Sequence, residues 1–162
     1  MAWFAGTVKL DWSLDPDELL RHADQIAKAT EKMIDRTEEP LQTLPDDRFN
    51  LLLKNSISPL PLHKSLVLLE QIKQQSDSPY LRHELLALAK ALVFSISNLH
   101  FGPEVGVSKA KTDAQVVDSW LEGIEAIVAD LRYLKTLPNT SAIVHHADSR
   151  QLADVLTPNS ID

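Results

Sequence analysis

The stretch LRHELLALAKALVFSISNL, residues 81–99, decides the fold. From Leu85 to Leu99 its one charged residue is Lys90, and apolar side chains occupy nearly every face of a helix. A helix that is hydrophobic all round either lies at the centre of a bundle or spans a membrane. This run is too short to cross a bilayer and has a lysine in its middle. We therefore predict a central apolar helix over about 79–99, with Lys90 reaching outward, and no membrane segment.

A ridge of leucines gives this helix its inward face. Ser78 and Pro79 form a typical helix start, in which proline takes the first helical position. The apolar residues that follow recur at helical spacing: Leu81, Leu85, Leu88, Leu92, Ile96 and Leu99. Such spacing places them on one side of a helix, so we expect the other helices to close around this ridge.

The best-marked helix start lies nearer the N-terminus. Asp15 can cap a helix, Pro16 suits its first position, and Asp17 complements the positive end of the helix dipole. Pro40 stops the segment, because proline cannot continue a helix. These signals predict a helix over about 16–38.

Two stripes divide the surface of this first helix. One is apolar and is expected to face a partner helix. Its members are Leu19, Ala23, Ile26, Thr30, Met33 and Thr37. The other is charged, brings together opposite charges such as Asp17 and Arg21 four residues apart, and is expected to face water. Its members are Asp17, Arg21, Asp24, Lys28, Glu31, Asp35 and Glu38.

Start and stop signals predict three further helices. Ser58-Pro59 opens one of them, and Thr112 with Gln115, at the spacing of a capping box, opens another. The longest loop, residues 100–111, contains two of the four glycines and is long enough to cross the end of a bundle. The predicted ranges are about 45–54 for a short connector helix, 59–75 and 113–136.

These elements describe an all-α bundle of four main helices plus a connector. We divide the chain into an apolar N-terminal arm at 1–14, a helical bundle domain at 15–137, and a polar C-terminal tail at 138–162. A short helix is expected in the tail near Ser149–Leu156. The arm lies outside every helix that the spacing predicts.

Composition and charge exclude several classes of function. The 162 residues include no cysteine, which removes disulfides, thiolate nucleophiles and iron–sulfur clusters and favours a cytoplasmic protein. The first residues lack the basic and uninterrupted apolar regions of a signal peptide. A formal net charge of −7 disfavours nucleic-acid binding and suits a basic protein partner.

Metal and catalytic signatures are weak. The six histidines do not show the Glu-x-x-His spacing of a di-iron bundle, since Glu18 and His22 are four residues apart. An all-α magnesium-dependent nucleotide-processing enzyme needs paired acidic motifs, and Glu122 with Glu125 supplies one of them. We expect no catalytic residue, metal or cofactor, and keep Glu122 and Glu125 as the site of that alternative.

A second candidate site precedes the last long helix. Lys109, Lys111 and Thr112 follow a glycine-containing loop at a helix start, where amide groups and lysines can hold an anion. No strand precedes them and the spacing is not that of a P-loop. We interpret them as loop residues, and keep a small helical subunit of a nucleoprotein complex as a further alternative.

Apolar and charged surfaces remain as candidate binding sites. Trp3, Phe4 and Trp12 place large aromatics near the chain start, where they either tuck under the bundle, which we favour, or anchor a partner. On the first helix the exposed acids Asp17, Asp24 and Glu31 suit a basic partner, and the half-apolar seam suits a second subunit. The function that we predict is a non-catalytic protein-binding or regulatory module, of adaptor or inhibitor type, with self-association as a further expectation.

Overall fold

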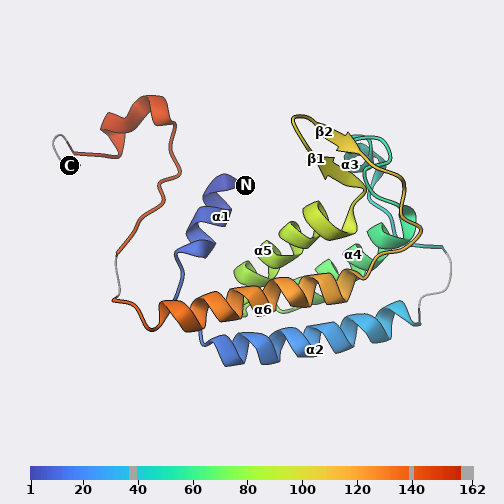
Figure 1. The fold of residues 1–162 in the computed structure, drawn as a ribbon, viewed down its shortest axis with the longest axis horizontal. Helices are drawn as coiled ribbons and strands as arrows, with labels where there is room; N and C mark the ends of the chain where they lie inside the picture. The colour runs from blue at the N-terminus through green and yellow to red at the C-terminus, as the bar shows by residue number, and fades with distance from the viewer. Residues whose placement is uncertain (37–39, 139–140, 158–162) are drawn as a thin grey trace.

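The computed structural model describes residues 1–36, 40–138 and 141–157, and its architecture is mostly helical (Figure 1). Short helices lie at both ends of the bundle, and a small β-hairpin lies at one end. The all-α bundle that the sequence predicts is confirmed. Its four long helices are α2 (Pro16–Ile34), α4 (Pro59–Gln74), α5 (Leu81–Ala91) and α6 (Val116–Leu134).

The core lies between these four helices and is centred on Trp120 of α6. Its side chain is fully buried, and its indole Nε1 donates a hydrogen bond of 3.0 Å to the backbone carbonyl of Glu84 on α5. Apolar residues of the other helices surround it: Leu19, Ala23 and Ile26 of α2, Leu68 and Ile72 of α4, and Ala87 and Leu88 of α5. Burying such side chains drives the assembly of amphipathic helices.

The start of α2 matches the prediction, and its end does not. Oδ1 of Asp15 accepts hydrogen bonds from the amides of Asp17 and Glu18 at 2.9 and 3.0 Å, so the predicted cap is confirmed. The helix ends at Ile34, and Met33 is exposed although the spacing placed it in the seam. The predicted positions Thr37 and Glu38 lie outside the described residues.

The central helix is shorter than predicted. α5 ends at Ala91, a π-helical turn η1 (Leu92–Ile96) follows, and the chain is extended at Ser97. The physical reason is Asn98, which is buried and whose side chain is hydrogen-bonded to Asn55 and Ser58, two residues that precede α4 in the chain. Its amide Nδ2 donates to the carbonyl of Asn55, so the chain leaves the helix to satisfy this side chain. Lys90 is exposed, as predicted.

The segment predicted as a loop at 100–111 contains a β-hairpin. β1 (Leu99–Phe101) and β2 (Val105–Val107) pair antiparallel. Apolar residues alternate with His100 and Gly106 here, a period of two that the helical prediction overlooked. The capping box predicted at Thr112 is also wrong, because α6 begins only at Val116 and Gln115 makes no side-chain cap bond.

The ends of the chain and the connector complete the structure. α1 (Ala2–Lys9) is helical, which corrects the expectation that the arm lies outside any helix; its Val8 is buried. The connector α3 (Asp46–Phe49) is shorter than the predicted 45–54. The short tail helix is present as a 3₁₀ helix, η2 (Ser149–Asp154), and stands apart from the bundle in Figure 1. Within the described ranges, no helix is long and apolar enough to cross a membrane.

Candidate functional site

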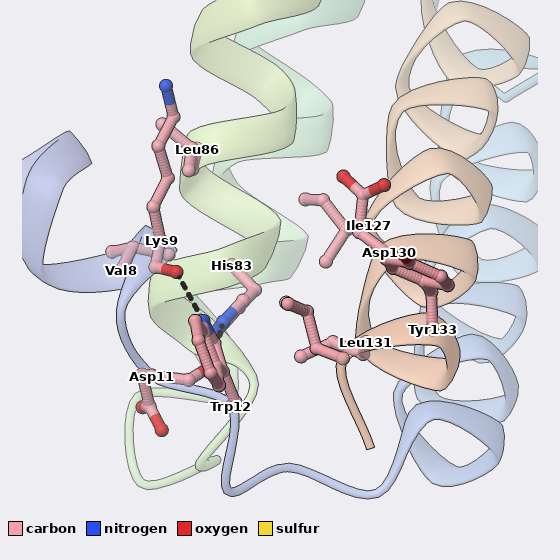
Figure 2. A pocket seen from close by; sticks show the side chains of 11 residues that line it. Val8, Lys9, Asp11, Trp12, His83, Leu86, Ile127, Asp130, Leu131 and Tyr133 are labelled. Atoms are coloured by element: carbon pink, nitrogen blue, oxygen red, sulfur yellow. Dashed lines mark hydrogen bonds between the residues drawn. The ribbon is translucent and has the colours of Figure 1, made fainter. Parts of the chain in front are cut away.

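A pocket of about 380 Å³ lies where α1, α5 and α6 meet (Figure 2). Its surface is mainly apolar and comes from all three helices and the turn after α1. The apolar lining consists of Val8, Leu86, Ile127, Leu131 and Leu134. Pockets that bury small molecules or protruding side chains begin at roughly 300 Å³ and are lined mostly by apolar groups, so this one reaches the lower end of that range.

Trp12 forms one wall of the pocket. Figure 2 shows its indole ring beside His83, with Ile127 and Leu131 of α6 facing them across the opening. The indole Nε1 donates a hydrogen bond of 2.7 Å to the carbonyl of Lys9, where the turn after α1 begins. This bond fixes the ring, so the wall is formed before any ligand arrives, which lowers the entropic cost of binding.

His83 lies at the base of this wall and is buried. Its Nε2 donates a hydrogen bond of 3.2 Å to the carbonyl of Asp11, whereas Nδ1 has no hydrogen-bond partner among the described residues. Burial lowers the pKa of His83, and the carbonyl and charge of Asp11 only partly oppose this effect. The imidazole is therefore neutral at physiological pH and adds a weakly polar surface to the wall.

Charged groups stand at the rim. Lys9 and Asp130 are exposed on either side of the opening, and in Figure 2 the Lys9 ammonium points away from the apolar lining. The hydroxyl of Ser13 donates a 2.6 Å hydrogen bond to Asp11 Oδ1 and, as the largest cause, lowers the pKa of that carboxyl. An incoming group therefore meets an apolar interior and a rim that can orient its polar parts.

A second cleft adjoins the pocket at Trp12. It measures about 370 Å³ and shares Asp11, Trp12 and Leu134 with the first. Lys135 and Ala142 lie along it, so α6 and the start of the tail both border it.

The three N-terminal aromatics have different surroundings. Trp12 lines the pocket and packs against the core. Phe4 is half-buried, with the Arg82 guanidinium 5.9 Å from its ring centroid. Trp3 is exposed on α1, and its ring centroid lies 5.0 Å from that of His146 in the tail. Only the first of these residues belongs to the pocket.

The acids predicted on the first helix lie elsewhere. Asp17, Asp24 and Glu31 are exposed along α2 and line neither cleft beside Trp12. Asp17 forms a salt bridge with Arg132 of α6, and Arg21 pairs with Glu18 instead of the predicted Asp17. Exposed pairs of this kind add little stability. The charged face of α2 is open to solvent.

The residues kept for anion and metal binding, Lys109, Lys111, Thr112, Glu122 and Glu125, do not line the pocket beside Trp12. Lys109 and Thr112 are exposed, while Lys111 Nζ donates to the carbonyl of Ser97 at 2.8 Å and thereby caps the end of η1. Glu122 and Glu125 are exposed on α6. Among the residues that the structure describes, no group of three or more histidine or acidic side chains could hold a metal ion.

The sequence indicated Trp12 but not the rest of the pocket. Val8, Leu86 and Ile127 come from three separate helices, and α1 itself was not predicted. The missed signal is the apolar character of residues 2–8, which suits a short helix lying on the bundle.

Comparison with known proteins shows no relative. No protein-family model, curated protein or solved structure matches this chain.

Proposed function

We propose that this chain is a non-catalytic protein-binding module, and that the pocket beside Trp12 takes a large apolar side chain of its partner. The observation that supports this is the pocket itself, an apolar recess of about 380 Å³ with a fixed indole wall. Binding energy at protein interfaces concentrates in such recesses, where one anchor side chain is fully desolvated. Burying a leucine or phenylalanine side chain is worth roughly 1.5–3 kcal/mol.

The negative charge of the chain favours basic residues on either side of the apolar anchor residue in the partner. The formal net charge is −7, and Asp130 is exposed at the pocket rim. Basic residues beside the anchor would be attracted over long range and would pair with the rim carboxylate. The partner segment is therefore apolar at its centre and basic at its edges. We infer a cytoplasmic setting, which suits a chain without cysteine.

A selection from a displayed library of random peptides tests this proposal. Peptides selected on the wild-type chain should share one large apolar residue with Lys or Arg nearby. Leu86→Trp fills the pocket from α5 and should weaken their binding roughly tenfold to a hundredfold, as expected for losing one buried side chain. Leu51→Trp is the matched control, because Leu51 is 84% exposed and lines neither cleft beside Trp12. It should bind these peptides as the wild type does.

Two results would count against the proposal. One is tight binding of the selected peptides to Leu86→Trp, equal to that of the wild type, which would place the binding surface elsewhere. The other is a selection that yields peptides without a large apolar residue. A charge reversal, Asp130→Lys, adds a second arm: it should weaken the basic-flanked peptides and reduce the dependence of their binding on salt.

A further inference from the structure

The hairpin lies at the end of the bundle opposite to α1 and the end of α6 (Figure 1), the elements that line the pocket. Its register pairs Leu99 with Val107 and Phe101 with Val105. Residues directly opposite one another on antiparallel strands share a face, and so do residues two apart along a strand. All four of these side chains therefore project to the same side of the hairpin.

This face is open to solvent and continues onto η1. Phe101 is 50% exposed and Val105 is 57% exposed. Phe94 of η1, 71% exposed, has its ring centroid 5.7 Å from that of Phe101. We call the set of Phe94, Leu99, Phe101, Val105 and Val107 the hairpin face.

The exposed area of the hairpin face is large for a surface that stays uncovered. A fully exposed phenylalanine presents roughly 200 Å². With exposures of 71% and 50%, Phe94 and Phe101 alone present roughly 240 Å². The valines bring the face into the range of roughly 300–600 Å² of the largest apolar patches on monomers, which are often functional.

The hairpin face is also the least charged part of an acidic chain. Residues 91–103 contain no Asp, Glu, Lys or Arg, and Glu104 is the one charged residue between Lys90 and Lys109. Elsewhere a net charge of −7 makes two copies of the chain repel one another. The charged groups that border the hairpin face are Glu104 in the turn of the hairpin and Lys111 at the end of η1. Two copies can therefore approach most closely at this sparsely charged face.

We propose that a second copy of this chain covers the hairpin face, with the two hairpins packed face to face about a twofold axis. A twofold contact uses the same patch on both subunits, and an apolar, uncharged patch is complementary to itself. A different protein would be selected mainly by complementary charge, which this patch does not offer. The contact is separate from the pocket beside Trp12, which leaves that pocket open to its own partner.

The area predicts the strength of this contact. Two hairpin faces together bury less than the roughly 1,200 Å² of stable interfaces. The dimer is therefore weak and is populated only at high protein concentration. Salt should strengthen the contact, because it screens the repulsion between the two acidic copies. A contact held by opposite charges would weaken instead.

Sedimentation velocity over a concentration series tests the proposal. The wild-type chain should shift from monomer toward dimer between micromolar and millimolar concentration, and further at higher salt. The double variant Phe94→Ser/Phe101→Ser should stay monomeric over the same range. Tyr133→Ser is the matched control, since Tyr133 is an aromatic residue, 66% exposed, near the pocket at the opposite end. It should dimerise as the wild type does.

A folding measurement keeps the result unambiguous. Phe94 and Phe101 are exposed, so their replacement should leave the circular dichroism and thermal midpoint of the monomer unchanged. Hydrogen exchange should show slower exchange of amides 99–107 at high concentration. The proposal is overturned if the wild type stays monomeric at every concentration tested, if a folded double variant still dimerises, or if added salt dissociates the dimer.

Discussion

Nδ1 of His22 on α2 lies 2.6 Å from Oε1 of Glu84 on α5, and this hydrogen-bonded pair joins the two helices inside the bundle. The Glu84 side chain is fully buried, and its second oxygen, Oε2, has no hydrogen-bond partner among the described residues. The imidazole ring of His22 also packs against the ring of Tyr80, with 5.3 Å between the two ring centroids. A buried carboxyl with one unpaired oxygen is costly when ionised.

Glu84→Gln should change the pH dependence of stability. Burial raises the pKa of Glu84 above its ordinary 4.5, and the hydrogen bond and charge of His22 only partly oppose this. The carboxyl thus stabilises the fold most below pH 4.5 and loses that contribution as pH rises through the folded pKa. The stability of Glu84→Gln relative to the wild type should therefore increase with pH, as measured by urea unfolding at several pH values. Parallel pH curves for the two proteins would contradict this account.

His83→Gln should reduce the sensitivity of the fold to acid. Burial lowers the pKa of His83 below 6.5, so neutral His83 stabilises the fold above pH 6.5, and this contribution is lost as pH falls through the folded pKa. Unfolding free energy should fall with a slope of up to about 1.4 kcal/mol per pH unit in the wild type. The slope should be smaller in His83→Gln, whose amide can still donate to the Asp11 carbonyl. His145→Gln, at an exposed histidine, is the control and should behave as the wild type does.

Asn98→Ala should loosen the hairpin end of the bundle. The Asn98 amide donates to the carbonyl of Asn55 at 2.9 Å and to Ser58 Oγ at 3.1 Å, and its oxygen accepts from the Lys111 amide at 3.0 Å. Removing this buried hub leaves several polar groups unpaired, at a cost of roughly 2–4 kcal/mol. Urea unfolding should show the loss, and hydrogen exchange should quicken at 99–107. Asn50→Ala, at an exposed position, should leave both unchanged.

Gly123 should accept one methyl group but not a larger side chain. A Cβ placed there would lie 3.4 Å from the Ala87 Cβ, an ordinary contact between α6 and α5. Gly123→Ala should raise stability by about 0.5–1 kcal/mol, because alanine favours the helix more than glycine does. Gly123→Leu should lower it by roughly 1–3 kcal/mol by pushing the helices apart. Thermal unfolding of both variants measures the difference, and equal effects of the two would refute the close packing.

Local patterns predicted the bundle and the starts of α2 and α4, whereas long-range contacts of one side chain accompany the end of η1. The cap at Asp15 depends on amides two and three residues away, and it was predicted from the sequence. The end of η1 is next to Asn98, whose side-chain partners Asn55 and Ser58 lie 43 and 40 residues earlier in the chain. Spacing along one helix carries no information about such contacts.

The candidate pocket was likewise predicted only in part from local sequence. Trp12 stood out as a large aromatic near the chain start, but the wall it forms requires α1 to lie on α5 and the end of α6 to lie opposite. The spacing of residues along the helix did not indicate a role for His83. In the structure these adjacent residues point to different partners, Asp11 and His22, because neighbours on a helix are about 100° apart.

The most direct test of the binding function is fluorine NMR of the chain labelled with 5-fluorotryptophan. Its three tryptophans occupy different surroundings: Trp12 lines the pocket, Trp3 is exposed on α1, and Trp120 is fully buried in the core. Titration with a selected apolar peptide should shift and broaden the Trp12 resonance while that of Trp120 stays in place. A peptide that binds without moving the Trp12 resonance would contradict the account.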